Sequence, residues 1–211
     1  MSKPETEDEI NARANEKARK RKEVRERILA TKTREKGLLI VHTGKGKGKS
    51  TAAFGLVLRS LGHGMRVGVV QFVKGKWETG ERAALARFKD LVDIRTMGEG
   101  FTWDTQDRAR DIRAAEAAWQ AAKAMIEACR GPEPRYDLIV LDELNIVLRY
   151  DYLPLASVVE FLAAKPERLH LVVTGRNAKP ELVAIADLVT EMTMVKHPFT
   201  AGIKAQKGIE F

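Results

Sequence analysis

The stretch "LLIVHTGKGKGKSTAAFGL", residues 38–56, places an apolar run, a loop of alternating glycine and lysine, and a helical pattern in direct succession. Residues 38–41 predict a buried strand, and residues 51–61 predict a helix. Glycines let successive backbone N–H groups face one point, and a helix N-terminus adds a positive dipole, so this order of elements forms an anion cradle. The stretch therefore predicts phosphate binding, with a flexible glycine turn as the alternative.

The loop ends as a Walker A loop does but begins differently. Gly48-Lys49-Ser50 matches the ending of that motif, in which the lysine reaches phosphate oxygens and the hydroxyl binds Mg²⁺. The usual first glycine falls at position 43, where this chain has Thr43, so a start at Gly44 leaves the loop one residue short. The candidate phosphate-binding residues are Gly44, Lys45, Gly46, Lys47, Gly48, Lys49, Ser50 and Thr51.

Length and composition indicate a globular protein with one sizeable core. The chain has 211 residues, of which 44% are hydrophobic and 31% are charged. The apolar runs are strand-sized, well short of the ~20 residues that span a bilayer, and the N-terminus is charged, so we expect a cytoplasmic protein that does not enter a membrane. The single cysteine, Cys129, has helical spacing from Ile126 and Ala122 and is expected to be a buried core thiol.

The chain has a net charge of +8, and its N-terminal segment supplies part of this positive charge. Residues 1–36 contain twelve Lys or Arg and eight Asp or Glu, with a thin apolar stripe, and predict a charged helical or mobile arm. This arm is either a solvated appendage or a segment that docks over a site or a partner chain. No aromatic residue lies among its charges, which argues against single-stranded nucleic acid as a partner. Residues 37–211 are expected to form the nucleotide-binding domain.

Beyond the arm, strand-like runs alternate with helical patterns. Further strands are predicted at 66–73, 91–97, 136–142, 169–174 and 188–195, and the clearest helix carries apolar residues from Ile112 to Cys129, before Gly131-Pro132. This alternation predicts an α/β fold with a parallel sheet. Ligands of such folds bind at the carboxyl ends of the strands, so binding and catalytic residues are expected in the loops that follow the strands.

Two of those loops carry charged candidates. "YDLIVLDEL", residues 136–144, is an apolar strand that ends in Asp142 and Glu143, as a Walker B segment does, and a carboxylate there would hold Mg²⁺ opposite the loop hydroxyl. The alternative is a surface turn or a helix cap. "VVTGR", residues 172–176, ends a later strand in Arg176, which either clamps a phosphate or forms an exposed salt bridge.

A third loop carries rings. In "GEGFTWDTQ", residues 98–106, Phe101 and Trp103 lie in a glycine-flanked connection. Such rings either plug a loop into the core or line a ligand pocket. A flat apolar ligand would prefer them to lysines, so the pair hints at a second, bulky substrate beside the nucleotide.

Taken together with "GHGMRVGVVQFVKG", "YDYLP" and the tail "VKHPFTAGIKAQKGIEF", these segments resemble the P-loop ATP:corrinoid adenosyltransferases, also called cob(I)yrinic acid a,c-diamide adenosyltransferases. The resemblance runs from about residue 37 to residue 211 and includes the shortened loop. It implies a RecA-like fold with a mostly parallel sheet flanked by helices, and a homodimer. It also implies that ATP binds in an orientation reversed from that in other P-loop proteins. The implied reaction transfers the 5′-deoxyadenosyl group of ATP to the cobalt(I) of a reduced corrinoid and releases triphosphate.

The resemblance also implies roles for residues. The loop from Gly44 to Ser50 would hold the triphosphate, Ser50 and Glu143 would hold Mg²⁺, and Phe101 and Trp103 would lie beneath the corrin ring. A flavoprotein reductase would supply the electron that forms cobalt(I), and the N-terminal arm can cover the corrinoid site in the family. Two other classes remain: a RecA-like P-loop ATPase or kinase, which would release ADP, and a basic nucleic-acid binder.

Overall fold

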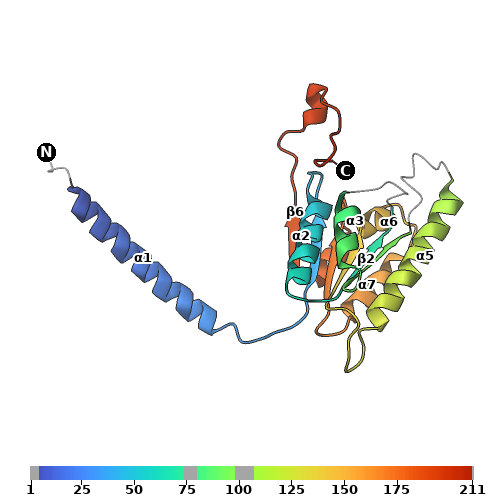
Figure 1. The fold of residues 1–211 in the computed structure, drawn as a ribbon, viewed down its shortest axis with the longest axis horizontal. Coiled ribbons are helices and arrows are strands. Elements are labelled where there is room, and N and C mark those ends of the chain that lie inside the picture. Colours follow the sequence, from blue (N-terminus) through green and yellow to red (C-terminus); the bar gives the residue numbers. More distant parts are fainter. Residues whose placement is uncertain (1–4, 74–79, 98–106, 211) are drawn as a thin grey trace. The chain divides into compact units, whose positions relative to one another are not determined.

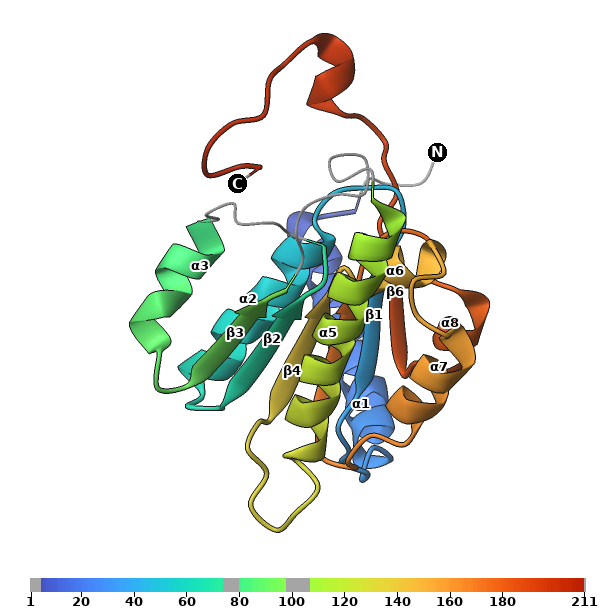
Figure 2. The same ribbon diagram turned by 90° about the vertical axis from the view of Figure 1, so that its right-hand side faces the viewer.

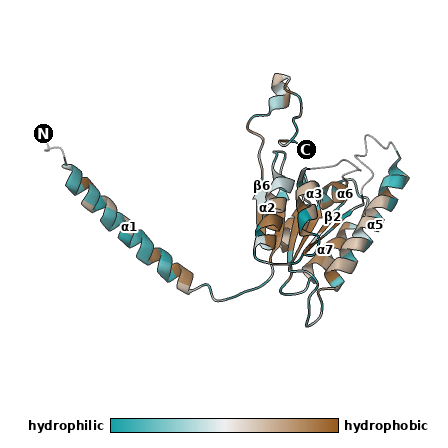
Figure 3. Ribbon diagram, viewed as in Figure 1, coloured by the Kyte–Doolittle hydropathy of each residue, from teal (hydrophilic) through white to brown (hydrophobic). Residues whose placement is uncertain are grey.

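The structure is a computed structural model that describes residues 5–73, 80–97 and 107–210. The chain divides into two compact units, Met1–Glu35 and Lys36–Phe211. In the first unit, helix α1 (Glu7–Ala30) begins at a capping box, in which the Thr6 hydroxyl accepts from the Glu9 N–H and the Glu9 carboxylate accepts from the Thr6 N–H. No residue of α1 is buried, and its ribbon is mostly hydrophilic (Figure 3). Ion pairs within the helix, such as those of Arg19 with Glu16 and Glu23, are exposed, so each contributes little to the stability of the helix.

The second unit is built on a parallel sheet (Figure 1). Its six described strands have the order β3-β2-β4-β5-β1-β6, and every neighbouring pair is parallel. This confirms the predicted α/β fold with a parallel sheet and is consistent with a RecA-like P-loop fold. The strands are β1 (Leu39–Thr43), β2 (Val67–Gln71), β3 (Val92–Thr96), β4 (Leu138–Asp142), β5 (His170–Thr174) and β6 (Leu188–Glu191).

Helices cover both faces of the sheet, so each face has its own hydrophobic core (Figure 2). On one face α2 (Lys49–Gly62) and α3 (Gly80–Leu85) pack on alternate strand residues such as Ile40 and Val140. On the other, α5 (Arg108–Glu127), α6 (Leu144–Arg149), α7 (Leu155–Ala163) and α8 (Pro180–Ile185) cover residues such as Val41 and Leu141. The 3-10 helices η1 (Ala86–Phe88) and η2 (Pro198–Ala201) follow α3 and β6.

Several predicted boundaries were wrong, among them the ends of β2, β6 and the helix α5 and the start of β4. Strand β6 ends at Glu191 rather than at residue 195, because β1 ends at Thr43 and the next carbonyl, that of Met192, accepts from Gly46 in the glycine loop. Helix α5 ends at Glu127, so Cys129 lies in the following turn. Its thiol is nevertheless buried, as expected, and burial raises its pKa.

Across residues 5–73, 80–97 and 107–210, no helix combines the length and the apolar composition needed to cross a bilayer.

Candidate functional site

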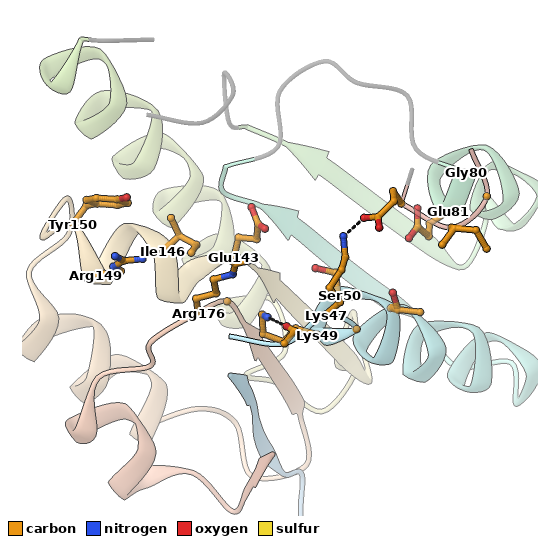
Figure 4. Close-up of a pocket in the computed structure, with 17 residues that line it drawn as sticks. Lys47, Lys49, Ser50, Gly80, Glu81, Glu143, Ile146, Arg149, Tyr150 and Arg176 are labelled. Atoms are coloured by element: carbon orange, nitrogen blue, oxygen red, sulfur yellow. Dashed lines mark hydrogen bonds and ion pairs between the residues drawn. The ribbon is translucent and has the colours of Figure 1, made fainter. Parts of the chain in front are cut away.

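A pocket of about 690 Å³ opens at the carboxyl ends of the strands (Figure 4). Its volume lies within the range of small-molecule sites, about 300–1,000 Å³. The glycine loop and the start of α2 form one wall, and α6 forms another. Within the described part of the chain, the rest of the lining comes from three short segments: residues 80–81 of α3, residues 175–176 after β5 and residues 208–210 of the C-terminal tail.

The glycine loop connects β1 to α2 in close contact with the segment after β6. Gly44 and Gly48 have φ of 96° and 102°, a backbone region that favours glycine. A Cβ on Gly46 would lie 2.6 Å from the carbonyl oxygen of Thr193, so only glycine fits against that backbone. The Gly46 N–H donates to the Met192 oxygen at 2.7 Å, and the Lys49 ammonium donates to the Gly46 oxygen. The loop is therefore shaped by the segment after β6 as well as by its own sequence.

Positive charge converges on this pocket. Lys47, Lys49 and Arg176 all line it. Burial lowers the pKa of the Lys49 ammonium, and the charge of Arg176 lowers it further, while the carboxylate of Glu143 acts in the opposite direction. Lys47 forms an ion pair with Glu210 of the tail (Figure 4). A phosphate chain placed among these cations would offset their mutual repulsion, so the electrostatics favour a polyanionic ligand.

The two acids at the end of β4 occupy different environments. Asp142 is fully buried, and its Oδ1 atom accepts from the Ser50 and Thr174 hydroxyls, each at 2.8 Å. Glu143 lines the pocket and occupies the left-handed region at φ 66°, where its N–H donates to the Thr174 hydroxyl at 2.9 Å. Non-glycine residues in this region cost about 1–3 kcal/mol and gather at functional sites.

The donor set suits a hard cation bound together with phosphate. Within the described ranges, no group of three His, Cys, Asp or Glu side chains is placed to hold a metal ion. Mg²⁺ typically takes one or two protein oxygens and completes its shell with substrate phosphates and water. The Ser50 hydroxyl and the Glu143 carboxylate both line the pocket beside the phosphate-loop cations, and such oxygen donors fit that mode of binding.

The wall formed by α6 is partly apolar and aromatic. Ile146, Arg149 and Tyr150 line it, and Figure 4 shows them across the pocket from Lys47 and Ser50. The Arg149 guanidinium lies 5.4 Å from the centre of the Tyr150 ring, which stacks on Tyr152 at 5.6 Å. A flat ring system would find favourable contacts on this wall.

Most of the predicted site residues lie together. Gly46, Lys47, Gly48, Lys49, Ser50, Thr51, Glu143 and Arg176 all line the pocket. Gly44 and Lys45 belong to the same loop but are not among the lining residues, and the side chain of Lys45 is exposed. Phe101 and Trp103 lie outside the described residues.

Sequence reasoning missed several residues that the structure brings to the site. Gln71 and Thr174 hydrogen-bond to Asp142, and each is the last residue of an apolar strand, which is a signal that the sequence does contain. Tyr150 lies in a segment recognised only as part of a family motif. Glu210 reaches the loop through a tail whose fold no local pattern predicts.

Comparison with known proteins found a matching family model and several similar proteins. A family model described as ATP:corrinoid adenosyltransferase BtuR/CobO/CobP matches residues 35–211. A corrinoid adenosyltransferase of Sinorhizobium sp is 56% identical over 203 residues, which cover 95% of this chain and 92% of that protein. One of Pseudomonas aeruginosa is 52% identical over 203 residues, covering 96% and 98%. The corrinoid adenosyltransferase CobA of Salmonella typhimurium is 44% identical over 195 residues, covering 91% and 96%.

Proposed function

The chain belongs to the ATP:corrinoid adenosyltransferase family, and we propose that it transfers the 5′-deoxyadenosyl group of ATP to the cobalt(I) of a corrinoid and releases inorganic triphosphate. The observation that carries this proposal is the pocket itself. It combines the one-residue-short glycine loop and its converging cations with the acids at the end of β4. That combination suits a triphosphate that leaves as a unit.

The reaction places few demands on side-chain acid–base chemistry. Cobalt(I) of the corrinoid substrate is the nucleophile: its electron pair forms the bond to the ribose 5′ carbon, and the C–O bond to the triphosphate breaks with its electrons going to the leaving oxygen. The protein has to align the two reacting atoms and stabilise the charge on the triphosphate. We assign the second task to Lys47 and Lys49, supported by Arg176 and the N-terminus of α2.

The metal site is proposed on the same grounds. Ser50 and Glu143 would hold Mg²⁺, with Asp142 directing the Ser50 hydroxyl. When bound, Mg²⁺ would supply positive charge to the phosphate oxygens. Gly44 and Lys45, which do not line the pocket, are proposed to act through the shape and charge of the loop.

The corrinoid side of the reaction rests on the family resemblance. We propose that Phe101 and Trp103 lie beneath the corrin ring and exclude its lower axial ligand. A flat, four-coordinate cobalt accepts an electron more easily, which tunes the metal through its surroundings. A flavoprotein reductase is the proposed electron donor. The proposal extends to a cytoplasmic homodimer with an N-terminal arm, residues 1–36, and a catalytic domain, residues 37–211.

The test is a product assay with a matched pair of variants. The purified protein is incubated with ATP, Mg²⁺ and cobalamin reduced chemically to cobalt(I), and the light-sensitive cobalt–carbon bond is followed by spectroscopy. Lys49→Ala should lower turnover by about 10²-fold or more, since it removes a donor that stabilises the transition state. Arg59→Ala, an exposed cation on the same helix, should match the parent.

The phosphorus product decides between reaction classes. Triphosphate formed in proportion to the cobalt–carbon bond supports the proposal. Release of ADP and phosphate without a cobalt–carbon bond would instead make the protein an ATPase or kinase. Near-normal turnover of Lys49→Ala at saturating ATP would remove the role assigned to that lysine.

A further inference from the structure

Polar residues at the ends of four neighbouring strands are hydrogen-bonded in a row. Thr96 ends β3 and donates its hydroxyl proton to Gln71 Oε1 at 3.0 Å. Gln71 ends β2 and donates from Nε2 to Asp142 Oδ2 at 3.2 Å. Asp142 ends β4 and accepts at Oδ1 from Thr174, which ends β5. The row therefore crosses the sheet from its β3 edge to the strand beside β1.

The sheet register brings these residues together. Gln71 is paired directly with Thr96 on one side and with Asp142 on the other. A shift of one residue in either pairing would point the amide toward the opposite face of the sheet. The row is therefore a consequence of strand pairing, although its members are far apart in the sequence.

The direction of each hydrogen bond follows from the chemistry of its partners. An ionised carboxylate only accepts, so the Ser50 and Thr174 hydroxyls and the Gln71 amide all point protons at Asp142. Because the Ser50 proton is used in this way, its oxygen lone pairs are left for the pocket. Thr174 accepts from the Glu143 N–H and so fixes the backbone of that residue. Gln71 keeps its NH₂ toward Asp142 because its other end accepts from Thr96.

We propose that Gln71 and Thr96 are positioning residues for the magnesium–triphosphate site. They hold the plane of the Asp142 carboxylate, which in turn aims the Ser50 oxygen and, through Thr174, the Glu143 backbone. Gln71 is 4% exposed, and neither Gln71 nor Thr96 is among the described residues that line the pocket, so both act through Asp142. This role rests on the proposed function.

The expected effect falls on metal-dependent binding of ATP. Groups that orient a metal ligand typically account for 10–100-fold in metal affinity. Thr96 acts through Gln71 and Asp142, so we expect about tenfold, the lower end of that range, when its hydroxyl is lost. Binding of ATP without a divalent ion should change little, because the lysines and backbone N–H groups of the loop remain.

The experiment compares Thr96→Val, which removes the hydroxyl but keeps the shape, with Thr96→Ser, which keeps the hydroxyl. Thr190→Val, an exposed threonine on β6, is the matched control. Calorimetry without corrinoid gives the Mg²⁺ concentration that half-saturates ATP binding, and the ATP affinity in EDTA. Melting temperatures check that each full-length variant is folded. Gln71→Met, which replaces a buried amide by an apolar chain of similar length, is measured in the same way.

The proposal expects about a tenfold higher Mg²⁺ requirement for Thr96→Val and Gln71→Met, with Thr96→Ser and Thr190→Val within about twofold of the parent. If Gln71→Met does not fold, Thr96→Val decides the result. A Thr96→Val variant with the parent's Mg²⁺ requirement overturns the positioning role, and so does a Thr96→Ser variant that shares the defect. An equal loss of ATP affinity in EDTA also overturns it, since the damage would then be general. A parent that binds no ATP overturns the proposed function as well.

Discussion

Gly46→Ala tests the contact between the glycine loop and the segment after β6. The added Cβ would lie 2.6 Å from the Thr193 oxygen and 2.8 Å from the Met192 oxygen, both of them backbone atoms that cannot turn aside. The change should cost about 1–3 kcal/mol for overpacking. It should cost a further 0.5–1.5 kcal/mol, roughly, for weakening the hydrogen bond from Gly46 to Met192. The sum is about 1.5–4.5 kcal/mol in the free energy of unfolding.

Gly55→Ala is the matched control because it adds the same methyl group nine positions along the chain. Gly55 lies in the interior of α2 on its exposed side, and nothing lies within 4 Å of the position that the methyl group would take, so the change should stabilise the helix. The expected gain is about 0.5–1 kcal/mol. At roughly 2–4 °C per kcal/mol for a chain of this size, the melting temperature should fall by about 3–18 °C in Gly46→Ala and rise by about 1–4 °C in Gly55→Ala.

Thermal melts followed by circular dichroism measure both shifts, and calorimetry with ATP measures the consequence for the site. Gly46→Ala should also bind ATP more weakly, because the loop has to move away from the segment after β6. A Gly46→Ala protein that melts within about 2 °C of the parent, a shift equivalent to less than about 1 kcal/mol, would refute the close packing. Unchanged ATP affinity in a destabilised Gly46→Ala would show that this contact with the segment after β6 does not affect ATP binding.

Three further predictions concern charges. Glu143→Gln should raise the Mg²⁺ concentration needed for ATP binding, because an amide is a poorer ligand for a hard cation; an unchanged Mg²⁺ titration would move the metal elsewhere. Glu210→Gln removes the carboxylate that pairs with Lys47, so ATP should bind up to about fivefold more tightly with little change in melting temperature; weaker binding would instead mean that Glu210 positions the lysine. Burial, and then the charge of Lys165, lowers the pKa of His170, whose Nδ1 accepts from the Leu38 N–H. The neutral imidazole therefore contributes stability above about pH 6.5, the pKa of an unfolded histidine, and this contribution is lost as the pH falls below that value. Melting temperatures between pH 8 and pH 5 should therefore fall less in His170→Asn than in the parent, and equal slopes would contradict the assignment.

The fold was predictable because four of the six described strands, β1, β2, β4 and β5, are mostly apolar runs between polar segments. Buried parallel strands need apolar side chains on both faces, and β1, β2 and β4 are buried along their whole length. The glycine loop was also predictable, because its glycines are required by the backbone conformation of the loop itself, such as the positive φ of Gly44 and Gly48. The prediction failed at the ends of elements. Cys129 keeps helical spacing although α5 has ended, because its thiol still packs in the core beside the Met125 oxygen at 3.3 Å.

The supporting residues of the site were not predictable in the same way, because their partners are set by strand order. Gln71 and Asp142 are 71 residues apart, and nothing in either segment says that β2 lies beside β4. The tail is a second case. Glu210 reaches Lys47 across 163 residues, through a segment with one short 3-10 helix and little apolar periodicity.

One property of the sequence nevertheless carries information about register. The last residue of β2, β3, β4 and β5 is polar; three of these side chains are buried and Thr96 is half-buried. A buried polar side chain is costly unless it is hydrogen-bonded. If these four strands are neighbours, the costs are offset only when their ends are level, so that Gln71 meets both Thr96 and Asp142. The same alignment delivers a carboxylate to Ser50 at the start of α2. The requirement that stabilises the register is thus the one that assembles the candidate site, so disturbing any one strand end should affect stability and metal-dependent ATP binding together.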